Sequence, residues 1–169
     1  MAQKKTDRYT AHSDPQAGEK DKTMQNRKEV YAMDLKSYFD QTKGLGILST
    51  ANYDGQVDAA VYSRPHVMDD GTVAFIMRNR LTRHNLQTNP HAAYLFKEEG
   101  SGYKGKRLFL TMIKEEKESH RLYELRRRSY PLEKDRRSAK YLVFFSVDRT
   151  LPLIGPGTNE TRVISFEDE

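Results

Sequence analysis

Two turns that contain Asp-Gly, at 54–55 and 70–71, constrain the fold of this chain more than any other feature. Glycine adopts the positive φ angles of tight hairpin turns, and Asp-Gly is among the pairs most favoured there. The apolar runs beside these turns, 46–51, 56–63 and 72–77, have the length of ordinary strands. In the run 56–63, Val57, Ala59 and Val61 should lie on one face of the strand, and the residues between them on the other. Two hairpins in succession predict an antiparallel barrel rather than a parallel α/β sheet.

Other segments complete a mainly β (α+β) fold with a few flanking helices. Further apolar runs predict strands at 92–96, 108–113 and 140–147. Asn26 and Glu29 form a helix-start pattern, followed by one apolar helix face of Tyr31, Leu35, Tyr38 and Phe39. Helices are also expected at 114–128 and 132–139, a flexible loop at 97–107, an irregular apolar loop at 151–157 and an edge strand at 162–166.

A basic segment, 78–83, separates the strand 72–77 from a short helix that Asn89-Pro90 should end. The first turn of a helix carries unpaired N–H groups and the positive end of the dipole. With the Thr82 hydroxyl and the guanidinium groups of Arg78 and Arg83, that turn would suit a dianionic phosphate. The alternative, favoured by composition alone, is that these arginines are solvated surface charge.

Composition excludes several classes of protein. The chain has no Cys, and its five histidines lack the HExxH spacing, so neither a disulfide framework nor a metal site is predicted. No apolar run approaches the roughly 20 residues of a membrane-spanning helix. The polar N-terminus lacks an apolar signal core, so a cytoplasmic protein is expected. Residues 1–25 should form a disordered arm, and 26–169 a single domain.

The order of these motifs resembles the pyridoxamine 5′-phosphate oxidase-like family over about residues 35–148. The motifs are Arg64-Pro65, the Asp-Gly hairpin, Val73-Ala-Phe75, Arg83 followed by Asn85-Leu86, and Asn89-Pro90. The resemblance implies an FMN-binding split β-barrel and a homodimer with the cofactor at the subunit interface. It also implies site residues, namely Arg64, Pro65, His66 and Val67 along the flavin, Met77, Arg78 and Asn79 after the hairpin, Thr82 and Arg83 at the phosphate, and Lys106 reaching the neighbouring subunit's cofactor.

The function implied is that of a flavin-dependent oxidoreductase acting on an unidentified small molecule. Asp69 and Met77 stand where the true oxidases of the family carry Lys and Thr, so vitamin B6 oxidation is not implied. The alternative is a non-catalytic protein that binds flavin, a deazaflavin or haem. A nucleic-acid-associated protein is a third interpretation, since Arg126-Arg127-Arg128 is a basic run, although a net charge of +5 is modest. No catalytic residue can be assigned from spacing.

Overall fold

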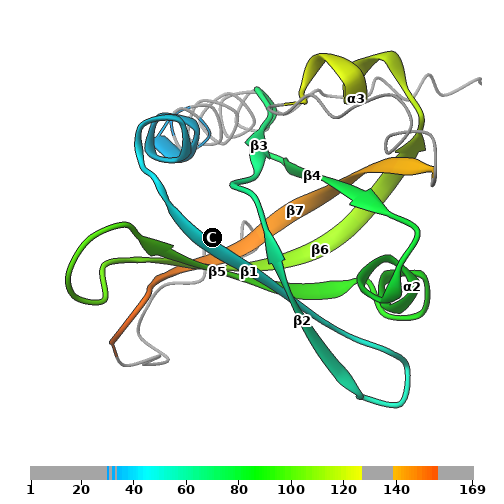
Figure 1. The fold of residues 1–169 in the computed structure, drawn as a ribbon, viewed down its shortest axis with the longest axis horizontal. Helices are drawn as coiled ribbons and strands as arrows, with labels where there is room; N and C mark the ends of the chain where they lie inside the picture. The colour runs from blue at the N-terminus through cyan, green and yellow to red at the C-terminus, as the bar shows by residue number, and fades with distance from the viewer. Residues whose placement is uncertain (1–29, 31, 33, 127–138, 156–169) are drawn as a thin grey trace, which may run out of the picture.

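One curled sheet forms the body of the protein (Figure 1). The computed structural model describes residues 30, 32, 34–126 and 139–155. Seven strands follow the order β2-β1-β5-β6-β7-β4-β3, and every neighbouring pair is antiparallel. Their bounds are β1 Gly44–Ala51, β2 Val57–Tyr62, β3 His66–Val67, β4 Val73–Arg78, β5 His91–Glu98, β6 Gly105–Lys117 and β7 Lys140–Pro152. The predicted antiparallel barrel and both Asp-Gly hairpins, β1–β2 and β3–β4, are confirmed.

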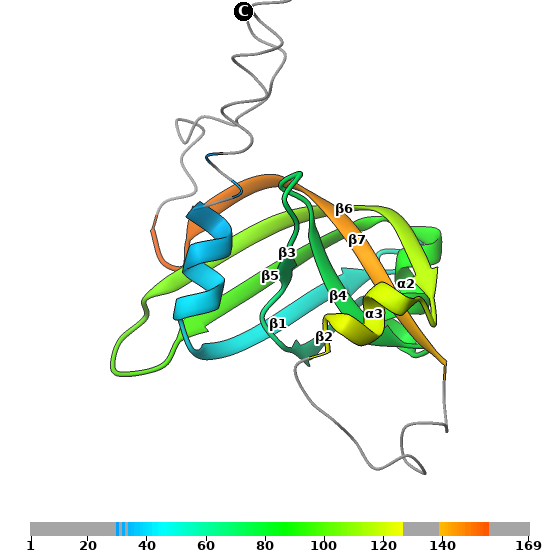
Figure 2. The same ribbon diagram turned by 90° about the horizontal axis from the view of Figure 1, so that it is seen from above.

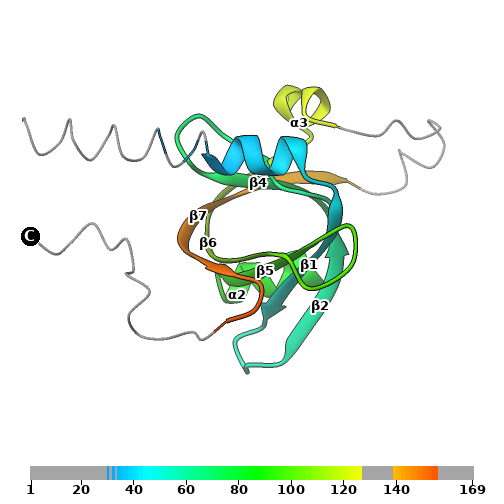
Figure 3. The ribbon, with the colours of Figure 1, turned by 90° about the vertical axis from the view of Figure 1, so that its left-hand side faces the viewer.

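The helices flank this sheet. They are α2, Leu81–Thr88, α3, His120–Glu124, and an earlier helix over residues 34–41. Figure 3 looks along the barrel and shows the helix 34–41 at the near end. Leu35 and Phe39 are buried on its inner face, as the apolar spacing predicts, and the Phe39 ring lies 5.3 Å from that of Phe96. No helix in the described part of the chain is long and apolar enough to cross a membrane.

The inner face of the sheet encloses the main core because its strands alternate between buried and exposed side chains. Tyr94 crosses this core, with its ring 5.0 Å from that of Phe75 and its hydroxyl donating to the Ser63 carbonyl at 3.1 Å. Gly46 makes room for Tyr94, because a Cβ at Gly46 would lie 1.9 Å from the tyrosine oxygen. The same Cβ would also lie 2.7 Å from the Tyr62 carbonyl oxygen, so a larger residue at 46 is excluded unless both Tyr94 and the backbone of β2 move.

The first half of strand β7, residues 140–145, is buried on both faces, which explains its nearly continuous apolar sequence. Tyr141, Val143 and Phe145 belong to the main core, whereas Leu142 and Phe144 point the other way into a second cluster. The short helix α3 covers that second cluster with Leu122 (Figure 2). The outer face of β4 and β7 is thus closed by α3.

The sheet does not close on itself, because β2 and β3 are its two edges. Side chains span the opening between them. The Tyr62 ring on β2 lies 5.9 Å from the Phe75 ring on β4, edge to face. Arg64, in the crossover from β2 to β3, donates to the carbonyls of Phe39 at 2.6 Å and Thr42 at 2.9 Å. Arg64 therefore ties this crossover to the end of the helix 34–41.

The helix expected at 114–128 is wrong over its first half. Strand β6 continues to Lys117 because Glu115 and Glu116 pair with Val143 and Leu142 of β7, and the helix α3 is only five residues long. Ser119 starts α3, its side chain accepting from the Leu122 N–H. A run of charged residues in a long strand has the same composition as the exposed surface of a helix. Here the pairing with β7 keeps the run 114–117 extended.

Two loop boundaries also differ from expectation. The loop expected at 97–107 is shorter, because β5 runs to Glu98 and β6 begins at Gly105. Leu151 and Pro152, expected in an irregular loop, extend β7, and Leu151 is buried. The expected arm 1–25, most of the helix 132–139 and the edge strand 162–166 lie outside the described residues.

Tyr38 stabilises the helix 34–41 against β5, and Tyr38→Phe tests this. Its hydroxyl donates to Glu98 Oε1 at 2.9 Å, and burial, assisted by that carboxylate, raises the pKa of Tyr38. We expect Tyr38→Phe to lower the free energy of unfolding by about 1 kcal/mol at neutral pH. A raised folded pKa means that this contribution is lost as pH rises above about 10. Urea unfolding of both proteins should therefore show a difference that shrinks in alkali; a constant difference would contradict this.

Candidate functional site

Helix α2 begins without a side-chain cap. Its N-cap residue, Arg80, is extended, with φ −136°, and the first turn has no acidic residue. The first backbone hydrogen bond joins the His84 N–H to the Arg80 carbonyl at 3.0 Å, so the N–H groups that precede His84 in the helix have no intrahelical acceptor. At the other end the Asn89 N–H donates to the Asn85 carbonyl, and Pro90 stops the helix as predicted.

Helix α2 packs against β1 and β2, which fixes the direction of its first turn. Leu86 enters the main core, and the buried Asn85 side chain donates to Thr50 Oγ1 of β1 at 3.2 Å. Thr82 is buried too, and its hydroxyl donates to Asp58 Oδ2 of β2 at 3.2 Å. The first turn therefore lies beside β2, an edge strand of the open sheet.

The Arg83 side chain makes several contacts at once. Its Nε donates to Glu115 Oε2 at 2.9 Å, its Nη2 donates to Glu115 Oε1, and its Nη1 donates to Asn79 Oδ1 at 2.9 Å. The guanidinium carbon lies 3.7 Å from the centre of the Tyr141 ring, a cation–π geometry. Glu115 raises the pKa of Arg83 further, so the group stays fully charged.

A second polar group lies on the β2 side of the same turn. Burial raises the pKa of Tyr62, and Asp58 adds to that effect, whereas a hydrogen bond from Thr82 and the charge of Arg80 act in the opposite sense. Tyr62, Asp58, Thr82 and Arg80 are therefore neighbours. Tyr62 stays a neutral phenol at physiological pH, and Asp58 is the carboxylate closest to the Thr82 hydroxyl.

These groups together fit an anion. Arg78, Arg80 and Arg83 bring three positive charges to the start of α2, and Asp58 and Glu115 bring two negative ones. The unpaired first-turn N–H groups add donors that no side chain occupies. The two side chains predicted to hold a phosphate, Thr82 and Arg83, both already contact a carboxylate, so a ligand there shares its donors with Asp58 and Glu115.

The structure separates the predicted site residues into three groups. Thr82 and Arg83 belong to the first turn of α2, Asn79 contacts Arg83, and Arg78 is the last residue of β4, two residues before the N-cap. Lys106 lies by the helix 34–41 instead, with its Nζ 4.6 Å from the centre of the Tyr38 ring. Figure 1 shows that helix and α2 at opposite ends of the barrel.

The remaining predicted residues lie along β3 and β4. Arg64 and Pro65 precede β3, and Arg64 holds the end of the helix 34–41. His66 and Val67 form β3 and are half-buried. The Met77 side chain is buried in the main core, so only its backbone, paired with Tyr141, faces the neighbouring strand.

Sequence reasoning missed Asp58, Glu115 and Tyr141 as members of this site. Asp58 is the one carboxylate in the apolar run 56–63, a signal that could have been used. Glu115 was hidden by the assignment of 114–128 to a helix, which separates it from α2. Tyr141 was counted only as part of a strand, because its ring contact with Arg83 depends on the pairing of β4 with β7.

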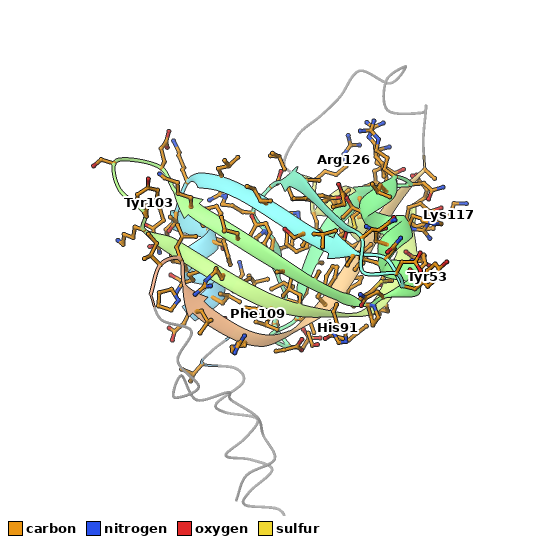
Figure 4. All side chains as sticks on the ribbon, turned by 90° about the horizontal axis from the view of Figure 1, so that it is seen from below. Tyr53, His91, Tyr103, Phe109, Lys117 and Arg126 are labelled. Atoms are coloured by element: carbon orange, nitrogen blue, oxygen red, sulfur yellow. The ribbon has the colours of Figure 1, made fainter. Side chains whose placement is uncertain are left out.

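The outer face of β2, β1 and β5 is apolar and exposed. Val57, Ala59 and Val61 share one face of β2, as their alternation predicts, and this face points outward, with Val57 and Val61 75% and 73% exposed. Val61 pairs with Ile47, which pairs with Leu95, so the apolar row continues across three strands. Figure 4 views the molecule from this side, with His91 and Phe109 labelled on it.

Solved structures share this architecture. An FMN-binding protein from Syntrophomonas wolfei is 17% identical, with a TM-score of 0.59, and the match covers 83% of this chain and 98% of that one. The HupZ protein of Group A Streptococcus is 18% identical, with a TM-score of 0.52 and coverage of 72% and 92%. No protein-family model and no curated protein matches the sequence.

The protein is therefore a mainly antiparallel split β-barrel. This is the fold that the order of the sequence motifs implied, and it is shared with the FMN-binding protein from Syntrophomonas wolfei.

Proposed function

We propose that this protein is a homodimeric flavoprotein that binds FMN and acts as an oxidoreductase on a small molecule. The observation that carries the proposal is the arginine-lined first turn of α2, placed beside the open edge of the barrel. The similar structure from Syntrophomonas wolfei is described as an FMN-binding protein, which supports the choice of cofactor. Bound FMN would supply the redox chemistry, and the protein would supply position and charge.

The phosphate would lie at the first turn of α2. The N–H groups there offer hydrogen bonds to an anion, and Arg78, Arg80 and Arg83 offer charge. The buried Leu86 and the hydrogen bond from Asn85 to Thr50 hold the helix in place, so these donors are fixed before the ligand arrives. A fixed set of donors lowers the ordering cost of binding.

The segment from Arg64 to Val67 would lie along the ring system. Arg64 binds the end of the helix 34–41, and the backbone of His66 and Val67 pairs with Ala74 and Val73. This segment is therefore held from both sides. We assign no acid or base in it.

A second copy of the chain would cover the apolar outer face of β2, β1 and β5. In this face Val61 and Leu95 are exposed and Ile47, which pairs with both, is half-buried. Exposed apolar surface is unfavourable in water, and its burial yields roughly 25 cal/mol for each Å². The face lies on the same edge strand, β2, whose inner side contacts Thr82 through Asp58. Dimerisation would therefore place the partner next to the proposed cofactor site.

Reconstitution tests the proposed function directly. The purified protein, incubated with FMN and passed over a desalting column, should retain a flavin absorption spectrum and release FMN on denaturation. A reduced pyridine nucleotide or dithionite should reduce the bound flavin, and a substrate that accepts the electrons should oxidise it again. A colourless protein that takes up neither FMN nor riboflavin would overturn the proposal, and a Soret band would favour haem instead.

A further inference from the structure

Three parts of the chain that are distant in sequence meet at the Arg83 guanidinium. Asn79 precedes α2, Glu115 belongs to β6 and Tyr141 to β7. The Arg83 and Glu115 side chains are only 14% and 23% exposed. Such a two-point contact between guanidinium and carboxylate fixes the plane of the arginine, and the ring of Tyr141 supports that plane from one face.

The contacts leave part of the guanidinium available. Arginine has five N–H donors, and Nε, Nη1 and Nη2 each use one in the bonds to Glu115 and Asn79. Glu115 takes the side of the fork formed by Nε and Nη2. One N–H on each Nη atom remains, and these two N–H groups can bind an anion while Glu115 stays in place.

We infer that Glu115 is a positioning residue, which holds Arg83 so that its remaining N–H groups serve the phosphate at the first turn of α2. The inference rests on the proposed function. Glu115 acts through Arg83 and does not contact the ligand itself. Asn79 and Tyr141 hold the same guanidinium from two other directions, but Glu115 alone takes two of its N–H groups.

Two effects of removing the Glu115 charge oppose each other. The loss of a nearby negative charge favours a phosphate, but water and salt screen charges at a partly exposed site. Freeing Arg83 means that its side chain must be ordered again at each binding event. That ordering corresponds to about a two- to tenfold loss in affinity. We expect the affinity lost through the ordering of Arg83 to exceed the affinity gained by removing the negative charge.

Glu115→Gln tests the inference, with Glu116→Gln as its matched control. Glu116 is the next residue of β6, and its carboxylate contacts Lys114 Nζ at 3.5 Å rather than Arg83. Both variants remove one negative charge from the same strand. A difference between them in the preference for FMN over riboflavin therefore measures the effect of the contact between Glu115 and Arg83. The measurement is the dissociation constant for FMN and for riboflavin, which lacks the phosphate, by titration of flavin fluorescence in the full-length protein.

We expect Glu115→Gln to lower the preference for FMN over riboflavin by more than about twofold and by less than about tenfold, and Glu116→Gln to leave it within about twofold. In the double variant Arg83→Ala/Glu115→Gln, the second substitution should have no further effect on the preference, because Glu115 acts only through Arg83.

Several outcomes would overturn the inference. Equal losses for both ligands in Glu115→Gln would mean that Glu115 only stabilises the fold. A stronger preference for FMN would mean that Glu115 competes with the phosphate. If the parent protein prefers FMN and Glu115→Gln has the same preference, then Glu115 has no role in positioning Arg83, and the proposed function is unaffected. A parent without any preference for FMN would overturn the phosphate site and this inference together.

Discussion

Replacement of Arg83 by alanine should weaken FMN binding by about 10- to 150-fold. A hydrogen bond to a charged group is worth roughly 1.5–3 kcal/mol, and each 1.4 kcal/mol is about a factor of ten in affinity. Arg83 is held at the first turn of α2 by Glu115 and Asn79, so its contribution is not reduced by disorder. The dissociation constant for FMN, by fluorescence titration at fixed salt, measures the effect.

Riboflavin provides the control for Arg83→Ala. The substitution also removes contacts with Glu115 and Tyr141, so some loss of stability is expected. A loss of stability alone would weaken both flavins, whereas a lost phosphate contact weakens FMN. Arg83→Lys keeps the charge but loses the fork, and should lie between the parent and the alanine variant. Rising salt should weaken FMN binding more in the parent than in Arg83→Ala. Equal losses for FMN and riboflavin would remove Arg83 from the site.

Replacement of Val61 by aspartate should convert the protein to a monomer that has lost its cofactor. Val61 lies in the exposed apolar row of β2, β1 and β5, which the proposed dimer buries. An unpaired charge buried at an interface costs about 3–5 kcal/mol, which corresponds to at least a hundredfold weaker dimer. Light scattering with in-line flavin absorbance measures both quantities on one sample.

The fold of the subunit should survive Val61→Asp. Val61 is 73% exposed in the single chain, so the free energy of unfolding should fall by less than about 1 kcal/mol, the span of strand propensities. Val61→Thr, which has the same shape without a charge, is the matched control and should remain dimeric. A parent protein that is monomeric by light scattering and still binds FMN tightly would refute the proposed assembly.

Local patterns in the sequence were sufficient to predict most strands and turns of the barrel. The Asp-Gly turns, the alternation in 56–63 and the stop at Asn89-Pro90 each depend on neighbouring residues, and the structure confirms all three. The charged run 114–117 could not be assigned in this way. Its extended form depends on pairing with β7, a strand more than 20 residues further on, and no local signal records that pairing.

The candidate site also combines features that depend on neighbouring residues with features that depend on the pairing of distant strands. The helix α2 and the arginines at its start could be predicted because Asn89-Pro90 marks its end and the basic segment 78–83 stands at its start. The partners of those arginines could not, since Glu115 and Tyr141 reach Arg83 only through the order of strands in the sheet. The sequence therefore indicated the donors of the site, and the tertiary structure added the carboxylates that restrain them.

The open side of the barrel has a mechanical consequence. Across it, β2 is linked to the rest of the fold by side chains, through Tyr62 against Phe75, Asp58 to Thr82, and the Ser63 carbonyl to Tyr94. Its backbone ladder faces only β1. Strand β2 can thus move away from β4 by exchanging side-chain contacts, while its own pairing with β1 and the pairing of β1 with β5 stay intact. Widening of this side would therefore leave the backbone ladders of the sheet in place, and it would move Asp58 relative to the arginines of α2.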